Sequence, residues 1–205
     1  MIIHNVEQKS EAWYELRKFR LTGSHAQEIG NCGKGLETYI IDVLASSYAI
    51  SGSDGYTNEN IDRGNLLEPE ARDVFSFLTG KEVKEVGFIE YNEYVGTSPD
   101  GIIPSENGMI EIKCHNNTKH FKFILNGEKE IESKYMWQMQ MNMLVGEFDH
   151  CYYIAYNPNF KESLLYYKIL PDEKMREKLL EGFKKGEEMI KELQSKVEKH
   201  ENIKS

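Results

Sequence analysis

The sequence predicts an α/β fold, in which a central mixed β-sheet is flanked by helices. Segments with helical spacing of apolar residues occupy the early part and the end of the chain. The middle section is instead rich in β-branched and aromatic residues, and one helical segment divides it. This order of elements is typical of a sheet layer packed between helices. The 205 residues are enough for one sizeable core, so we expect residues 1–205 to form a single domain.

Helices are expected over residues 10–20, 36–49, 62–79, 133–145 and 172–199. Ser10 is a suitable N-cap for the first helix. Because proline is tolerated best in a first helical turn, Pro69 indicates that the regular part of the third helix begins near Leu67 or Glu68. Residues 51–60 are rich in Gly, Ser and Asn and predict a loop. The last helix is highly charged, with its apolar residues loosely on one side.

Strands are expected at residues 83–91, 94–97, 109–115, 151–156 and 163–170, where β-branched and aromatic residues concentrate. Turn signals at 92–93 and 105–108 separate the first three of these strands. The helix expected at 133–145 lies between the third and the fourth, which allows a sheet of mixed strand direction.

The composition excludes several classes of protein. Acidic residues outnumber basic ones by 34 to 25, and this net charge of −9 argues against a general basic coat for nucleic acid. A local basic patch beside a metal site is still compatible with it. Cys32, Cys114 and Cys151 are too scattered for a zinc site, an iron–sulfur cluster or a disulfide framework. Without a long apolar run or a signal-peptide pattern, the protein is expected in the cytoplasm, with no membrane partner.

The residues that carry chemistry are SPDG at 98–101 and EIKC at 111–114. Side chains alternate across a strand, so Glu111 and Lys113 point to one face, away from Ile112 and Cys114. The turn at 105–108 lets the preceding segment return beside this strand, which brings Asp100 close to Glu111.

Two carboxylates and a backbone carbonyl make a good oxygen site for Mg²⁺, so Asp100, Glu111 and the Ile112 carbonyl are the candidate metal ligands. A metal there would offset phosphate charge and lower the pKa of a bound water. The Lys113 ammonium would orient that water or stabilise the developing charge. Taken alone, the same residues are also compatible with a turn and the solvated face of an edge strand.

Five motifs along the chain together resemble one family. They are AWYELRKFRLTGS, RGNLLEPEA, GTSPDG, EIKC and YMWQMQM, and they occur in the order found in the lambda exonuclease family, the YqaJ-like viral recombinases. This family belongs to the PD-(D/E)xK nuclease superfamily. The resemblance covers roughly residues 10–170 and implies a restriction-endonuclease-like core.

The resemblance assigns roles to individual residues. Asp100 and Glu111 would bind the metal, and Lys113 would be the catalytic lysine. Glu68 would be a helical carboxylate that completes or supports the metal site, although a helix N-terminal acid is the alternative interpretation. Gln138 would lie near the site and position water or phosphate, with Tyr135 and Gln140 as weaker candidates nearby.

A second group of residues would recognise the DNA end. By the resemblance, Arg17 contacts the terminal 5′-phosphate, and Ser24 and Ser98 donate hydroxyls in the same pocket. An arginine fork with hydroxyls is a suitable receptor for a dianionic phosphate. Ile61 falls where the family places an apolar wedge that splits the terminal base pair, or it simply packs at a helix start. The 50–60 loop is this chain's own, and the gap from Asp100 to Glu111 is one residue longer than in the prototype.

The resemblance implies a Mg²⁺-dependent 5′→3′ exonuclease, with Mn²⁺ as a substitute, that degrades linear double-stranded DNA and leaves 3′ single-stranded tails. It also implies a phage or prophage recombination setting in a bacterial host, a single-strand annealing protein as partner, and a homotrimeric ring. The charged C-terminal helix is one possible contact in that ring. The alternatives are a structure- or sequence-specific DNA endonuclease and a catalytically idle DNA-end-binding protein.

Overall fold

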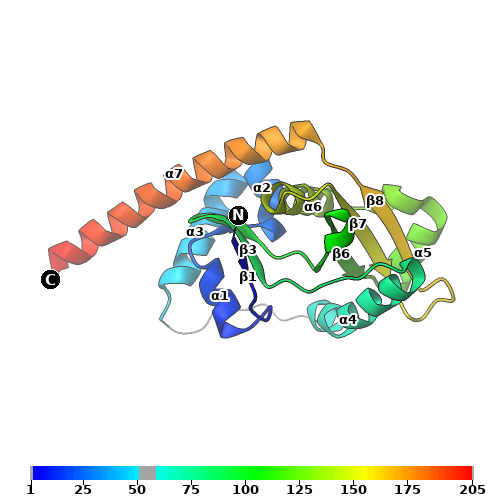
Figure 1. The fold of residues 1–205 in the computed structure, drawn as a ribbon. Coiled ribbons are helices and arrows are strands. Elements are labelled where there is room, and N and C mark those ends of the chain that lie inside the picture. Colours follow the sequence, from blue (N-terminus) through cyan, green and yellow to red (C-terminus); the bar gives the residue numbers. More distant parts are fainter. Residues whose placement is uncertain (1, 51–58, 205) are drawn as a thin grey trace.

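The computed structural model describes residues 2–50 and 59–204, without the side chains of residues 59–63, 65 and 201–204. The expected α/β class is confirmed (Figure 1). The helices are α1 (Glu11–Arg17), α2 (Ala26–Asn31), α3 (Lys34–Tyr48), α4 (Glu59–Thr79), α5 (Asn117–Asn126), α6 (Ser133–Gly146) and α7 (Glu173–Lys204). The strands are β1 (Ile2–His4), β2 (Leu21–Thr22), β3 (Phe88–Asn92), β4 (Val95–Thr97), β5 (Gly101–Ile103), β6 (Gly108–Cys114), β7 (His150–Tyr156) and β8 (Leu164–Ile169).

The strands form two four-stranded mixed sheets, where the sequence led us to expect one. Their orders are β1-β3-β4-β2 and β5-β6-β7-β8. The chain passes from the first sheet to the second through residues 98–100, between β4 and β5. Pro99 lies in this link and has no N–H to continue a strand ladder. The SPDG motif is therefore the junction between the two sheets.

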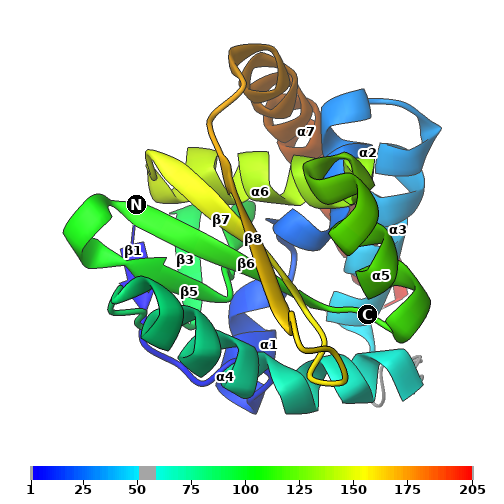
Figure 2. The same ribbon diagram turned by 90° about the vertical axis from the view of Figure 1, so that its right-hand side faces the viewer.

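The second sheet lies between helices on both faces (Figure 2). Ile110, Ile112 and Ile154 pack on one face against Ala71 and Phe75 of α4. The other face packs against α5 and α6 through a separate set of buried residues, Met109, Phe123, Met139, Met143 and Tyr153. β6 and β7 run parallel through the middle, because α5 and α6 make the crossover between them.

Several short elements were not expected from the sequence. β1, β2, β5 and α2 have at most six residues each, too few to show a periodic pattern, and α5 was also missed. The strand expected at 83–91 begins only at Phe88, and Lys84 forms an isolated bridge with Ile102 instead. α7 runs on to Lys204, five residues beyond the expected end at 199.

Two helix boundaries differ from the expectation for local reasons. α1 ends at Arg17 and not at residue 20, because Lys18 leaves helical geometry with a ψ of 136°. The regular part of α4 begins earlier than the expected residues 67 or 68, because the helix begins at Glu59 and contains Pro69 in its interior. The proline costs one helical hydrogen bond there, which the remaining helix tolerates. The loop expected at 51–60 lies outside the described residues except at residues 59 and 60, whose backbone begins α4.

The C-terminal helix α7 packs across the first half of the chain and then extends past it (Figure 1). Leu179, Phe183 and Ile190 are buried in the cluster that α2 and α3 also line. At Gly182 the α7 backbone passes so close to α2 that an added Cβ would lie 2.2 Å from the carbonyl oxygen of Ile29. In the described part of the chain, no helix combines the length and apolar character needed to cross a membrane.

The close approach at Gly182 gives a stability prediction. Gly182→Ala should lower the free energy of unfolding by about 1–3 kcal/mol, because the new methyl group must push α7 away from α2. Gly35→Ala is the matched control, since its nearest neighbour would be at 3.4 Å and alanine favours a helix by up to about 1 kcal/mol. Urea denaturation measures both. Equal stability of the two variants would contradict the close packing of α7 on α2.

Candidate active site

The register of β5 on β6 brings two of the expected acids together. Gly101 pairs with Ile110, so Asp100 lies beside Glu111 at the point where β5 begins. One carboxylate oxygen of Asp100 accepts a hydrogen bond of 2.6 Å from the backbone N–H of Ile112. Because the N–H and C=O of a strand residue point to the same edge, the Ile112 carbonyl is directed to the edge where Asp100 lies.

Glu111 is fully buried, and two side chains hold its carboxylate. Lys113 Nζ lies 2.6 Å from Oε1, and the amide of Asn142 donates to Oε2 over 3.3 Å. Glu111 and Lys113 therefore share one face of β6, as strand alternation predicts. Burial raises the pKa of Glu111 most, and the neighbouring Asp100 carboxylate raises it further, while the Lys113 ammonium opposes both effects.

Glu68 approaches this pair from α4. Burial is the main reason why the pKa of Glu68 is raised to about 6. Repulsion by the Asp100 carboxylate is the second reason. Its carboxylate is held by Arg72 one turn later on α4, with Nη2 and Oε1 separated by 3.1 Å. α4 begins at Glu59, so Glu68 lies beyond its first turn and is not a helix N-terminal acid.

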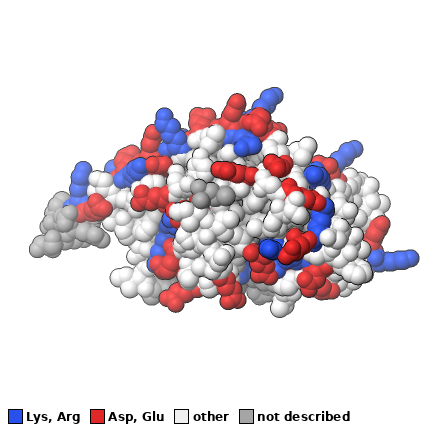
Figure 3. Space-filling view, viewed as in Figure 1, with Lys and Arg blue, Asp and Glu red and all other residues white. Residues whose placement is uncertain are grey.

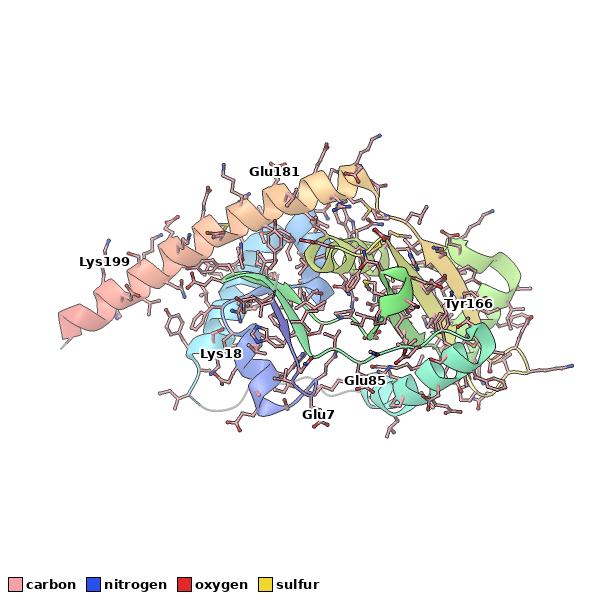
Figure 4. All side chains as sticks on the ribbon, viewed as in Figure 1. Glu7, Lys18, Glu85, Tyr166, Glu181 and Lys199 are labelled. Atoms are coloured by element: carbon pink, nitrogen blue, oxygen red, sulfur yellow. The ribbon has the colours of Figure 1, made fainter. Side chains whose placement is uncertain are left out.

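Arg72 is a site residue that the sequence did not single out. Its Nε donates to the backbone carbonyl of Asp100 over 3.2 Å, while Nη2 binds Glu68. Its remaining nitrogen pairs with Glu85, which Figure 4 labels near α4. One guanidinium therefore ties the helical acid to the backbone of the motif acid.

The three acids are candidate ligands for a divalent cation. Among the described residues, no three His, Cys, Asp or Glu side chains already form a metal-binding cluster. Each acid instead has a protein donor: Arg72 for Glu68, the Ile112 N–H for Asp100, and Lys113 with Asn142 for Glu111. Repulsion among the three acids still contributes to the raised pKa values of Glu68 and Glu111, and a hard cation would relieve it. The carboxylate oxygens are the donor type that a hard divalent cation prefers, but the three acids do not converge on one point in the part of the chain that the structure describes.

A small pocket of about 150 Å³ collects the residues expected to bind a DNA end. Its walls include Arg17, Ser24, Ser98 and Gln138, and it is named the small pocket below. Ser98 is also two residues before Asp100 in the chain. The sequence assigned these residues to end recognition and to the catalytic site separately, and the structure places them around one cavity.

The surroundings of the Arg17 guanidinium leave it able to bind an anion in the small pocket. Its guanidinium lies 4.1 Å from the centre of the Trp13 ring and donates to Thr22 Oγ1 over 3.2 Å. In the described part of the chain, no carboxylate lies within ion-pair distance of it. Burial lowers the pKa of Arg17, which means that its charge lacks solvation that an anionic ligand could supply.

The hydroxyl of Ser98 is likewise oriented by Trp13. The indole Nε1 donates to Ser98 Oγ over 2.9 Å, which leaves the hydroxyl hydrogen available for a ligand. Gln8 holds the link between the sheets by donating to the carbonyl of Pro99 over 3.0 Å. Gly23 is needed at the pocket wall, because a Cβ there would lie 2.4 Å from Oδ1 of Asn142.

The other candidates divide into two groups. The Tyr135 ring lies beside the active site, with its centre 4.9 Å from Lys113 Nζ. Gln140 is buried away from it and serves the fold, because its amide binds the carbonyl of Leu170 and the N–H of Asp172. The side chain of Ile61, the expected wedge, lies outside the described residues.

The most informative residue that sequence reasoning missed is Asn142. It follows Gln138 by four residues on α6, so the two share one face of the helix. That spacing is a signal that could have identified it. Arg72 stands in the same relation to Glu68 on α4, again four residues later.

Residues 12–149 match the family described as the YqaJ-like viral recombinase domain. The chain belongs to this family. No curated protein matches the sequence. The match includes all three acids and every described residue of the small pocket except Gln8, so the family membership applies to the part of the chain that forms the site.

Solved structures of two exonucleases are similar to this YqaJ-like protein. The alkaline exonuclease LHK-Exo from Laribacter hongkongensis superposes with a TM-score of 0.78 at 25% identity, over 93% of this chain and 99% of that one. Its complex with dAMP gives a TM-score of 0.77 at 26% identity, with the same coverage. A phage-related exonuclease from Haemophilus somnus shares the fold, with a TM-score of 0.69 at 15% identity over 89% and 98% of the two chains. The family and the LHK-Exo likeness support an exodeoxyribonuclease.

The contacts of Arg72 predict a measurable contribution to cleavage. Arg72→Gln should lower the cleavage rate on linear duplex DNA by about 10–100-fold, because Glu68 and the Asp100 backbone lose their shared support. Arg176→Gln is the control, since that arginine pairs only with Glu173 on α7 at 3.7 Å. Circular dichroism should show both variants folded. A rate for Arg72→Gln equal to that of the control would rule out the supporting role.

Proposed function

We propose that this YqaJ-like protein is a divalent-metal-dependent exonuclease that degrades linear double-stranded DNA from its 5′ ends. The observation that carries the proposal is the position of the small pocket, whose residue Ser98 is joined to Asp100 through Pro99 alone. A terminal phosphate held in the small pocket would leave the next phosphodiester near the acids. LHK-Exo has been solved with dAMP, a 5′-mononucleotide of the kind that such cleavage releases.

The residues of the chain divide the chemistry between them. Arg17, Ser24 and Ser98 hold the 5′-phosphate by charge-assisted and hydroxyl hydrogen bonds. Asp100, Glu111, the Ile112 carbonyl and Glu68 would hold Mg²⁺, or Mn²⁺ in its place. The bound cation would supply Lewis-acid stabilisation of phosphate charge and a more acidic water.

Two further side chains act on the scissile phosphate. The Lys113 ammonium, fixed beside Glu111 at 2.6 Å, stabilises the negative charge that develops during water attack. Gln138 lines the small pocket and orients water or phosphate there. Basic and acidic residues are interspersed on the face drawn in Figure 3, which shows no continuous basic coat.

The wider setting of the proposal comes from the family resemblance. Digestion of one strand would leave 3′ single-stranded tails for phage-type recombination in the cytoplasm of a bacterial host. A single-strand annealing protein would bind those tails, and a homotrimeric ring around the DNA would keep the enzyme on its substrate. The projecting part of α7 is available for contacts between subunits (Figure 1).

Digestion of 5′-labelled linear duplex DNA beside a covalently closed circle tests the proposed activity. With Mg²⁺, the label should be released from the linear DNA as a mononucleotide, and the circle should stay intact. Asp100→Asn should abolish release while the protein remains folded, because the change removes one charge and keeps the shape of the side chain. Cleavage of the circle would indicate an endonuclease, and binding without cleavage of either DNA would indicate an end-binding protein.

The small pocket predicts a preference for phosphorylated ends. Arg17→Ala should reduce the ratio of cleavage rates on 5′-phosphorylated and 5′-hydroxyl ends by roughly 10–100-fold, because hydrogen bonds to charged groups contribute about 1.5–3 kcal/mol. Arg176→Ala, far along the chain on α7, should keep the wild-type ratio. If Arg17→Ala also keeps it, Arg17 does not bind the phosphate.

A further inference from the structure

A second, larger pocket adjoins the small pocket on the other side of Arg17. Its volume is about 480 Å³, within the range of roughly 300–1,000 Å³ that suits a small organic ligand. Arg17 and Ser24 line both pockets, so a ligand that contacts them can extend from one into the other. This large pocket lies between α1 and α3, and none of the three acids is among the described residues that line it.

The walls of the large pocket carry aromatic rings suited to stacking. The ring of His25 lies on that of Tyr39 with centroids 4.0 Å apart and planes at 13°. One face of His25 is therefore covered, and the other remains for a ligand. Tyr14 lines the same pocket with 56% of its surface exposed. Such rings accept any nucleobase, since every base has a flat π-face.

The charges of the large pocket disfavour a second phosphate. Lys18, labelled beside α1 in Figure 4, pairs with Glu15 at 2.6 Å. Arg20 pairs with Glu90 at 3.0 Å. Asp42 adds a carboxylate to the lining, which would repel an anion and could accept a hydrogen bond from an exocyclic amino group. The pocket is thus suited to the uncharged part of a nucleotide.

We infer that the large pocket binds the nucleobase of the 5′-terminal nucleotide, stacked on His25, while Arg17 and Ser24 hold its 5′-phosphate. This inference rests on the proposed function, because it assumes that the small pocket takes that phosphate. A base in the large pocket has left its complementary strand, so the terminal base pair must open before cleavage. The released mononucleotide has the same two parts and competes for the same site.

Binding of two small probes tests the base pocket without any cleavage. dAMP carries both the base and the phosphate, and deoxyribose 5-phosphate carries only the phosphate. By calorimetry, dAMP should bind the wild-type chain about tenfold more tightly than deoxyribose 5-phosphate, a ratio typical of one stacked base. His25→Ala should remove that ratio and leave deoxyribose 5-phosphate binding unchanged. His25→Phe keeps a flat ring and should retain the ratio, which excludes a general loss of folding.

The variants separate a failure of this inference from a failure of the proposed function. Arg17→Ala should weaken both probes, because both contain the phosphate. If Arg17→Ala does so but the two probes bind the wild-type chain equally, the small pocket stands and the base pocket is wrong. The inference is also wrong if His25→Ala keeps the wild-type ratio of dAMP affinity to deoxyribose 5-phosphate affinity. It is wrong as well if neither probe binds the wild-type chain.

A duplex whose 5′-phosphorylated terminal nucleotide is abasic tests the same site on DNA. Its KM should be about tenfold higher than that of the normal duplex for the wild-type enzyme, because the stacking contribution is lost. His25→Ala should show equal KM values for the two duplexes, while His200→Ala, a histidine on α7, should behave as wild type. Equal KM values in the wild-type enzyme would contradict a base pocket even if the exonuclease activity is present.

Discussion

The burial of the Glu111 carboxylate is the constraint on which the rest of the site depends. A carboxylate without contact with water costs several kcal/mol unless it is paired and hydrogen-bonded. Lys113 supplies the charge from the same strand, and Asn142 supplies an amide from α6. Both must keep their positions, so β6 and α6 are held at one separation. Gly23 meets the same requirement, because only a residue without Cβ leaves room for Asn142.

The break between the two sheets explains why the small pocket and Asp100 are close in the chain but differ in their surroundings. Pro99 interrupts the ladder, and the residues on either side of it, Ser98 and Asp100, enter different environments. Ser98 accepts a hydrogen bond from Trp13 and lines the small pocket, while Asp100 accepts a hydrogen bond from the backbone of β6. The covalent link between them fixes the distance between the two parts of the site. An end-directed nuclease requires that fixed distance, since it must bind one phosphate and cleave at the next.

Sequence reasoning reached the residues whose signal is local. The E-x-K alternation on β6 and the acid before β5 follow from strand geometry, and the shared face of Glu111 and Lys113 is confirmed. The division into two sheets was not predicted, because β2 and β5 are too short to show a pattern. Arg72 and Asn142 were not identified from the sequence, because their importance lies in contacts across the fold. Burial and ring stacking at His25 are also tertiary, which is why the large pocket had no counterpart in the sequence.

The claim that Glu68, Asp100 and Glu111 form one cation site is tested most directly by metal binding in the absence of DNA. Calorimetric titration of the wild-type chain with Ca²⁺ or Mn²⁺ should show saturable binding. Asp100→Asn should weaken that binding by about tenfold or more, because it removes one of the three carboxylate charges. Equal affinity in the two proteins would contradict a shared site at these three carboxylates.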